Sequence, residues 1–577
     1  MASFLARNGL LLAVLLVVPV LGGEFWAYQL GLYLIYAIAA VGLGLAWGQA
    51  GILSLGQGLF VGLAAYVSAL CLKATNNPLL MYLGIPAAVL VAAALAFAVA
   101  ALVFKGRTES GPAFSLITLA LALSGFQIAT SWTAVTGGFN GLIGIPGLPG
   151  IDGILPLYIL IAVALVPTVA LADWLVRAPV GTLWRAVAQD ERRLAFFGYS
   201  TPLIKAAVFA VAGGFAGLAG AIYAPQQNLV TPDLTGFAFS GSLVVFAAVG
   251  GRFTVLGPVL GAVVVGILSA ELRERVVWWE LVVGLFFILV VLRFPGGLMT
   301  LFGPFSRWIP VRIGKANVAE APSKRGSAAP LSVTFDDVRV KLGDVTILDG
   351  LSLATGEEGT LCVIGPNGAG KTSTLNVMTG ALPRRSGRIL IGGDEVRRPT
   401  PASIARRGIG RKFQTPSVFP GLTIGENLAI ALWSGRVRWW DLLRPSLYGW
   451  TSPVLREMQG RFRFLEASER RASDLSHGER QVLELTMALC TEPRLLLLDE
   501  PCAGLSHQET GAVVALLRWA RKTLGLRIII IEHDMELVRQ LADRVVVLHQ
   551  GKFLSQGTIE AVQADAAVRA VYVGGTR

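Results

Sequence analysis

One loop in the second half of the chain has the residue types and spacing of a phosphate cradle. GPNGAGKTS follows the apolar run Leu361–Ile364 and fits G-x-x-x-x-G-K-[ST]. Glycines here let backbone N–H groups reach phosphate oxygens, and a helix expected to start near Lys371 turns its positive end toward them. Lys371 would reach the β- and γ-phosphates, and Thr372 would ligate Mg²⁺. The predicted nucleotide-binding residues are Gly365, Pro366, Asn367, Gly368, Ala369, Gly370, Lys371, Thr372 and Ser373.

A second stretch supplies acidic groups. RLLLLDEP, from Arg494 to Pro501, is an apolar strand pattern that ends in two adjacent carboxylates. Asp499 is placed to hold Mg²⁺, partly through water, and Glu500 is placed to polarise an attacking water. Two carboxylates at a strand end can also form an ordinary solvated turn. The phosphate loop upstream favours the catalytic interpretation, so the two stretches together predict hydrolysis of ATP.

A third pattern lies between these two. LSHGERQ, from Leu475 to Gln481, precedes the helical pattern VLELTMALC. Ser476 and Gly478 would cap that helix and present N–H groups to a γ-phosphate. By itself this is only a capping signal. In this position it resembles the signature motif of the ABC ATPases.

Two further residues extend the resemblance to the ABC ATPases. Gln414 in GRKFQTP is similar to the Q-loop glutamine, which implies contact with Mg²⁺ and water. His533 in IIIIEHD is similar to the switch histidine, which implies contact with the γ-phosphate. The resemblance thus implies Glu500, His533 and Gln414 as catalytic residues, with Thr372, Gln414 and Asp499 at the metal. One position departs from the family, since Leu342 stands where an aromatic side chain usually stacks on adenine.

The first half of the chain is built for a membrane. The 577 residues are 54% hydrophobic and only 15% charged, whereas soluble domains average roughly 25% charged. Apolar stretches of helix-spanning length recur from residue 9 to residue 292. We therefore predict a polytopic all-α permease of about ten spans, followed by an α/β P-loop ATPase domain. The predicted boundaries are 1–312 for the permease, 313–331 for a linker and 332–577 for the ATPase.

The distribution of basic residues predicts the orientation. Arg7, Lys105 with Arg107, the loop from Arg177 to Lys205, and Arg307 with Arg312 should face the cytoplasm. The same rule explains the net charge of +12 without nucleic acid, which we do not expect as a partner. We predict a multi-pass protein of the inner (plasma) membrane, with its ATPase domain in the cytoplasm and its spans in contact with lipid.

Two glycine-rich segments interrupt the helical pattern. GQAGILSLGQG, from Gly48 to Gly58, and GGRFTVLGPVLG, from Gly250 to Gly261, place polar residues in apolar surroundings. Non-helical backbone at membrane depth is tolerated beside protein or a water-filled cavity. The alternative is that the glycines only allow helices to pack closely. Because the spans hold almost no ionisable residue, the cargo should be neutral or zwitterionic.

These segments also narrow the family. Together with TGGFNGLIGIP, they resemble the permeases of importers for branched-chain amino acids, and IEHDMELV in the ATPase half agrees. GRKFQTPSVFPGLT is most similar to the members for urea and short amides, which gives a slight preference for those cargoes. The two components look fused here. The alternatives are an ABC exporter and a membrane-anchored ABC ATPase that does not transport; a nucleotide-gated channel is a third.

The resemblance implies partners as well. An ABC site forms between two ATPase domains, and this chain has one phosphate loop and one signature motif. A second permease and a second ATPase subunit, or a second copy of this chain, would complete the complex. An extracytoplasmic solute-binding protein would deliver the cargo.

One charged segment stands out in the apolar half. VAQDERRLAFFGYS, from Val187 to Ser200, resembles the coupling loop of importer permeases. We predict a helix from Gly181 to Phe197 that docks on an ATPase domain beside the Gln414 loop. A solvated amphipathic helix is the alternative, but the two phenylalanines would be costly in water.

Overall fold

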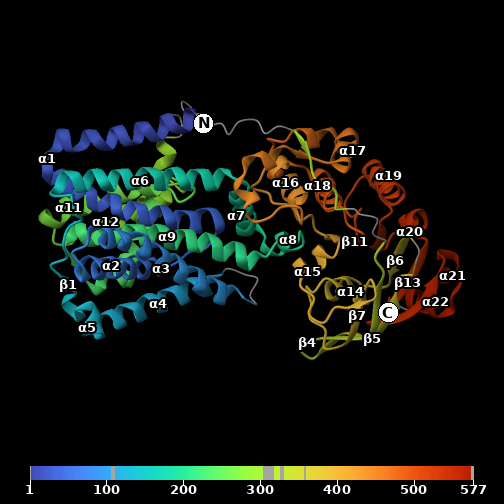
Figure 1. The fold of residues 1–577 in the computed structure, drawn as a ribbon. Helices are drawn as coiled ribbons and strands as arrows, with labels where there is room; N and C mark the ends of the chain where they lie inside the picture. Colours follow the sequence, from blue (N-terminus) through green and yellow to red (C-terminus); the bar gives the residue numbers. More distant parts are fainter. Residues whose placement is uncertain (1, 106–110, 303–317, 325–329, 357–358, 574–577) are drawn as a thin grey trace. The chain divides into compact units, whose positions relative to one another are not determined.

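The chain forms two compact units (Figure 1). The computed structural model describes residues 2–105, 111–302, 318–324, 330–356 and 359–573. Unit 1 comprises Met1–Ala188, Thr201–Lys315 and Leu443–Pro445, and unit 2 comprises Gln189–Ser200, Ala316–Leu442 and Ser446–Arg577. Arg107, Arg307, Arg312 and much of the predicted linker lie outside the described residues. The predicted boundaries at 312 and 332 therefore stay predictions.

Unit 1 is a bundle of apolar helices, and among those described fewer than the predicted ten or so have the length and hydropathy of a membrane span. Within the described residues, six stretches are long and apolar enough to cross a membrane by length and composition: Gly22–Gln49, Gln57–Ala74, Pro78–Phe104, Pro112–Ser131, Ile154–Arg177 and Thr201–Gln227. Asn8–Val17 and Phe237–Gly250 are shorter apolar helices. The helices are α1 (Ala2–Gly44), α2 (Gln57–Ala74), α3 (Pro78–Phe104), α4 (Pro112–Ser131), α5 (Thr133–Thr136), α6 (Ile154–Arg177), α7 (Pro179–Gln189), α9 (Thr201–Gln227), α10 (Phe237–Gly250), α11 (Gly257–Arg275) and α12 (Trp279–Arg293).

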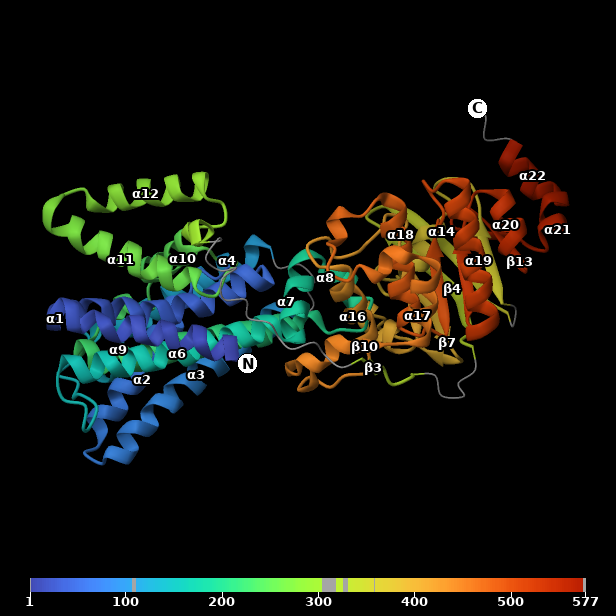
Figure 2. The same ribbon diagram turned by 90° about the horizontal axis from the view of Figure 1, so that it is seen from above.

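The core of unit 1 is packed by small residues. One face of α3 buries an alanine every fourth residue, Ala88, Ala92, Ala96 and Ala100, and packs against α9. A Cβ on Gly217 of α9 would lie 2.9 Å from the Ala92 methyl group. Close approach of helix backbones is the main source of helix association in lipid, because lipid tails are as apolar as the helix surface. α11 and α12 form an antiparallel pair (Figure 2).

The two glycine-rich interruptions meet each other. Gly48–Gly58 begins in the π-helix η1 (Leu45–Gln49) and continues as an irregular segment before α2, while Gly250–Gly261 includes the turn between α10 and α11. The Gln49 Nε2 donates a hydrogen bond to the Phe253 carbonyl at 3.1 Å. A Cβ on Gly44 would lie 2.9 Å from the Pro258 ring. The backbone between Gly51 and Gly56 is non-helical, and glycine at position 44 allows the two segments to approach each other closely.

A short 3-10 helix lies among the membrane helices. η3 (Pro232–Thr235) follows β2 (Leu229–Val230), which pairs antiparallel with β1 (Leu142–Ile143). η3 packs against α2 and α4. The remaining 3-10 turns of unit 1 are η2 (Gly138–Asn140) and η4 (Leu298–Phe302).

Unit 2 is built on a six-stranded sheet of order β14-β13-β6-β12-β11-β9, in which only β14 runs antiparallel to its neighbour. Every residue of β6 and β11 is buried, as expected for parallel strands covered on both faces. The carboxyl ends of β6, β12 and β11 lie at one edge. These strands are β6 (Thr360–Ile364), β9 (Ile409–Lys412), β11 (Leu495–Asp499), β12 (Arg527–Ile531), β13 (Arg544–His549) and β14 (Lys552–Gly557).

A second sheet and several helices complete unit 2. The second sheet has the order β5-β4-β7-β8, from β4 (Val333–Leu342), β5 (Val345–Ala354), β7 (Ser386–Ile391) and β8 (Asp394–Glu395). The main helices are α8 (Glu191–Ala195), α14 (Lys371–Met378), α15 (Pro401–Arg406), α16 (Ile424–Trp433), α17 (Pro453–Arg461), α18 (His477–Cys490), α19 (His507–Leu524), α20 (Met535–Leu541), α21 (Ile559–Ala564) and α22 (Ala566–Val573).

Residues 318–324, inside the predicted linker, are held against unit 2. β3 (Ala319–Glu320) pairs in parallel with β10 (Trp450–Thr451). Four residues later, the Lys324 backbone N–H donates to the Glu492 carboxylate at 2.8 Å. Arg436 contacts the same carboxylate at 2.9 Å and is almost fully buried. Residues 318–324 are therefore fixed within unit 2 by backbone pairing and by a hydrogen bond to the carboxylate of a buried ion pair.

Candidate functional site

The phosphate loop has the strand–loop–helix geometry that its spacing predicts. β6 ends at Ile364 and α14 begins at Lys371. Gly365, Gly368 and Gly370 have φ values of 151°, 80° and 94°. These conformations are strained for residues with a side chain, so the pattern of glycines is set by the turn itself. The loop presents the N-terminus of α14, which favours an anionic ligand.

Lys371 lies over the loop that precedes it. Its Nζ donates to the Gly365 carbonyl at 2.6 Å and to the Pro366 carbonyl at 3.0 Å. Burial lowers the pKa of Lys371, and the nearby Glu500 and Asp499 carboxylates partly oppose that shift. The Lys371 ammonium group therefore already lies at the loop, where it can contact the phosphates of a nucleotide.

Thr372 and Asp499 come together as predicted for a metal pair. The Thr372 Oγ1 donates to the Asp499 Oδ1 at 3.4 Å. Asp499 ends β11 and is nearly buried, and burial raises its pKa while Arg411 opposes the shift. A hydroxyl and a carboxylate are the oxygen ligands that Mg²⁺ prefers. These two residues thus fit a single Mg²⁺ shared with phosphate oxygens, and no cluster of three His, Cys, Asp or Glu side chains exists among the described residues.

The three predicted catalytic residues also gather. The Gln414 Nε2 donates to the Glu500 Oε2 at 2.8 Å, and the His533 Nδ1 lies 3.8 Å from the Glu500 Oε1. Glu500 has a φ of 44°, in the left-handed region that few residues with a side chain adopt. Its backbone N–H donates to the Ile531 carbonyl at 3.0 Å, which holds the conformation. Strain of this kind is typical of functional sites.

The signature residues lie elsewhere. Ser476 caps α18 in a reciprocal capping box with Glu479, in which the Ser476 N–H donates to the carboxylate at 2.8 Å. Within the described residues, no hydrogen bond or ion pair joins Ser476 or Gly478 to the phosphate loop. The structure therefore gathers the predicted catalytic and metal residues into one group and leaves the signature pair apart from it. Leu342 is exposed at the β4–β5 turn.

The charged segment of the permease sequence packs within the ATPase unit, but not as one helix. The prediction of a single helix from Gly181 to Phe197 is wrong, because Asp190 has extended backbone and separates α7 from α8. Its carboxylate instead caps α8 by accepting the Arg193 N–H at 2.8 Å. Gly198 ends the segment with a φ of 86°. Gln189–Ser200 belongs to unit 2 by its contacts.

The predicted position beside the Gln414 loop is confirmed on both sides of Gln414. Phe196 packs edge-on against Phe413 with ring centroids 4.9 Å apart. The Ser417 hydroxyl donates to the Asp190 carboxylate at 3.1 Å. Both phenylalanines of the segment are buried, and the Ser434 hydroxyl donates to the Phe197 carbonyl at 2.6 Å.

A buried ion pair anchors this segment, and the sequence analysis missed it. The Arg193 Nη1 lies 3.2 Å from the Glu484 Oε1, with side-chain exposures of 1% and 0%. The same nitrogen donates to the Arg411 carbonyl at 3.0 Å, and the guanidinium lies 4.6 Å from the centre of the Phe197 ring. Burial raises the pKa of Glu484, and Arg193 opposes that shift. The sequence feature that could have indicated this pair is Glu484 itself, an acidic residue in the otherwise apolar stretch VLELTMALC.

One cavity joins this segment to the nucleotide residues. It has a volume of about 560 Å³ and is lined by Asp190 and Arg193 from the segment, and by Thr372, Gln414 and Asp499. A change at the metal residues and a movement of the segment would therefore act on the same space.

Two family models match the chain. Residues 26–292 match "Branched-chain amino acid transport system / permease component", and residues 348–503 match "ABC transporter". Together they match a large part of each unit.

Curated relatives match the second unit. The branched-chain amino acid transport ATP-binding protein BraF of Pseudomonas aeruginosa is 32% identical over 247 residues, which is 41% of this chain and 94% of BraF. LivG of Escherichia coli is 32% identical over 253 residues, covering 42% of this chain and 97% of LivG. A solved ADP-bound ATP-binding cassette of an ABC transporter is 26% identical, covers 42% of this chain and 99% of its own, and has a TM-score of 0.37.

Proposed function

Because the chain belongs to the ABC transporters of the branched-chain amino acid type, with permease and ATP-binding components in one polypeptide, we propose that it imports branched-chain amino acids by hydrolysing ATP. The importer sits in the plasma (inner) membrane with the ATPase unit in the cytoplasm. One observation carries the coupling: a segment of the permease sequence lines the same cavity as Thr372, Gln414 and Asp499.

The residues divide the hydrolysis between them. The loop N–H groups and Lys371 bind the phosphates of ATP, and Glu500 orients and polarises the attacking water. Gln414 holds the Glu500 carboxylate through the 2.8 Å hydrogen bond and so ties that carboxylate to the loop that contacts the coupling segment. A Mg²⁺ held by Thr372, Asp499 and the Gln414 amide oxygen would neutralise phosphate charge.

The active complex contains two ATPase units. The position of Ser476 and Gly478 away from the phosphate loop supports a site closed by the signature motif of a second unit, from a second copy of this chain or from a separate ATPase subunit. A second permease and an extracytoplasmic solute-binding protein complete the importer.

Substitution of Glu500 tests the hydrolytic assignment. Glu500→Gln in the full chain, assembled with its partner subunits in proteoliposomes, should lower ATP turnover at least about 100-fold and keep ATP binding, because the amide cannot act as the base. Glu560→Gln, an exposed acid on α21, is the matched control. Full turnover by the Glu500 variant would refute the assignment.

The cargo is tested on the same proteoliposomes. Radiolabelled leucine, isoleucine and valine should accumulate only with ATP inside and the cognate binding protein outside. Uptake of labelled urea or acetamide without uptake of leucine would show that the cargo is urea or a short amide and not an amino acid. Export of cargo from the lumen would favour an ABC exporter. ATP turnover without any transport would favour a membrane-anchored ABC ATPase that does not transport.

A further inference from the structure

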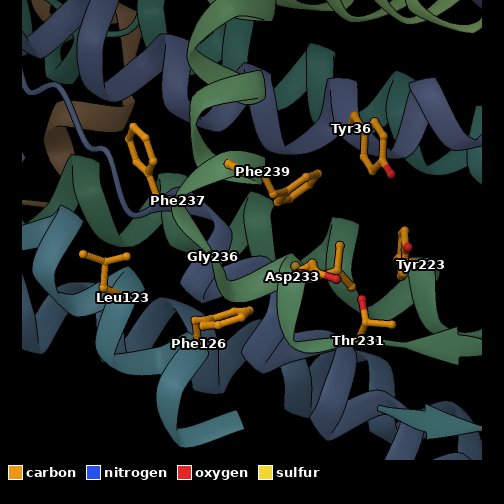
Figure 3. A pocket seen from close by; sticks show the side chains of 11 residues that line it. Tyr36, Leu123, Phe126, Tyr223, Thr231, Asp233, Gly236, Phe237 and Phe239 are labelled. Carbon is orange, nitrogen blue, oxygen red and sulfur yellow. The ribbon is translucent and has the colours of Figure 1, made fainter. Parts of the chain in front are cut away.

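Unit 1 contains an open pocket of about 530 Å³ at the level of η3 (Figure 3). Its wall comes from segments far apart in the sequence: α1, α4, α9 and the stretch from residue 231 to residue 239. The side chains that give the wall its chemical character are Tyr36, Phe126, Tyr223, Thr231, Asp233 and Phe239. No sequence motif marks them.

One side of the pocket is aromatic. The Tyr36 ring lies 5.1 Å from the Phe239 ring and 6.3 Å from the Tyr223 ring, measured between centroids. In Figure 3, Phe126 lies across the pocket from Phe239. Facing aromatic rings make a surface on which an aliphatic side chain gains contact area without any specific polar demand.

Asp233 is the polar exception. It is exposed to the pocket, and among the described residues its carboxylate takes part in no hydrogen bond and no ion pair. Its backbone is used, since the carbonyl accepts the Gly236 N–H at 3.0 Å. Most carboxylates of this kind cap a helix or form an ion pair with a cationic side chain. The Asp233 carboxylate does neither among the described residues. An unpaired carboxylate at the wall of a pocket is available to bind a cationic group of a ligand.

The position of Asp233 is fixed by close packing behind it. A Cβ on Gly58 of α2 would lie 2.8 Å from the Leu234 carbonyl oxygen, and one on Gly62 would lie 2.9 Å from the Thr235 nitrogen. The Thr235 hydroxyl donates to the Pro232 carbonyl at 2.7 Å. η3 thus rests on α2 with no room for a side chain between them, and holds Asp233 at the pocket as a preformed group.

Three side chains with hydroxyl groups stand on the same side of the pocket as the Asp233 carboxylate (Figure 3). Tyr36, Tyr223 and Thr231 lie at the end of the pocket where Asp233 stands, whereas Leu123 and Phe237 lie at the other end (Figure 3). The pocket therefore offers an acceptor with hydroxyl donors at one end and apolar surface beyond it.

We propose that this pocket is a cargo site for an apolar α-amino acid, in which Asp233 binds the α-ammonium group and the aromatic wall receives the aliphatic side chain. Urea and an ammonium group can both donate hydrogen bonds to the carboxylate, but only the ammonium adds the attraction between opposite charges, so the pocket prefers an amino acid to urea. The hydroxyl of Thr231 is a donor for the cargo carboxylate. This inference rests on the proposed importer function.

The test compares cargoes with and without the ammonium group. The full chain, assembled with its partner subunits and binding protein in proteoliposomes, is assayed for radiolabelled leucine uptake and for ATP turnover. Asp233→Asn should raise the KM for leucine uptake at least about tenfold, because the amide lacks the charge that attracts the ammonium group. Asp233→Glu should restore part of the loss. Asp152→Asn, an exposed carboxylate in the loop before α6, is the control.

A second variant tests the aromatic wall of the pocket independently of Asp233. Phe239→Ala should raise the KM for leucine more than the KM for alanine, because only the longer side chain reaches the aromatic wall. Unchanged leucine KM values in Asp233→Asn and Phe239→Ala would overturn the inference and leave the importer function standing. If the wild-type complex hydrolyses ATP and imports urea but not leucine, the amino acid cargo is wrong and the inference fails with it.

Discussion

The two units place their charged side chains in opposite ways. In unit 2, the buried Arg193 is paired with Glu484 and also stacks on Phe197, all within one compact body. In unit 1, the helices pack through alanine and glycine, and Asp233 faces an open pocket without a partner among the described residues. A paired buried charge fixes one protein segment against another, whereas an unpaired charge at a cavity is available to a ligand. The same kind of side chain therefore holds a segment in place in unit 2 and is available to a ligand in unit 1.

The largest effect should come from breaking the buried pair. Arg193→Met leaves the Glu484 carboxylate buried and uncompensated, which should destabilise the ATPase unit by about 3–5 kcal/mol and disconnect the coupling segment. Leucine uptake should fall at least about tenfold, and the thermal unfolding transition of the ATPase unit should move to a lower temperature. Both are measured on the full-length complex.

Two further variants separate charge from packing at this contact. Arg463→Met changes an exposed arginine elsewhere in unit 2 and should behave like the wild type. The double variant Arg193→Met with Glu484→Met removes both charges and should recover most of the lost stability, because two apolar groups can fill the space. A double variant as unstable as the single one would show that the pair acts through shape and not through charge.

A smaller effect is expected where unit 1 depends on close packing. Gly62→Ala would press against Thr235 of η3, so we expect a loss of about 1–3 kcal/mol and a higher KM for leucine as Asp233 is displaced. Gly241→Ala on α10 is the control, since a Cβ there meets nothing within 4 Å. Thermal unfolding and uptake of the two variants are compared, and equal values would contradict the role given to this contact.

The smallest effect is expected at Glu532, a buried carboxylate of unit 2 that forms no ion pair like that of Glu484 within the part of the chain that the structure describes. Glu532 is buried and its Oε1 has no hydrogen-bond partner among the described residues; burial raises the pKa of Glu532 from 4.5 to about 7. The folded state therefore holds a proton that the unfolded state has lost between about pH 4.5 and pH 7, so stability falls as pH rises through that window. The fall is at most about 1.4 kcal/mol per pH unit.

Replacement by an amide should remove this pH dependence. In Glu532→Gln, the thermal unfolding temperature of the ATPase unit should fall less between about pH 5 and pH 7 than in the wild type. Glu469→Gln, an exposed acid, should leave the slope unchanged. A wild-type slope in Glu532→Gln would mean that another group titrates in this window.

The sequence predicted the ATP site more completely than any other part. Lys371, Thr372 and Ser373 are adjacent residues of one loop, and Asp499 and Glu500 end one strand, so spacing alone places most of the chemistry. Gln414 and His533 were assigned by resemblance, and the structure brings both to Glu500. The position of the charged segment beside Gln414 was predicted correctly, but its single helix was wrong because Asp190 has extended backbone and caps α8.

The features that could be predicted from the sequence alone are local: a phosphate loop that needs glycines at fixed turns, apolar stretches long enough for a membrane, and a charged segment between them. The features that required the folded molecule are long-range. The Arg193–Glu484 pair joins positions 193 and 484, and the pocket joins Tyr36 to Asp233, and neither separation leaves a periodic or spaced pattern in the sequence. A sequence motif reflects contacts between residues that are close in the sequence, whereas a pocket between helices depends on how the whole bundle packs.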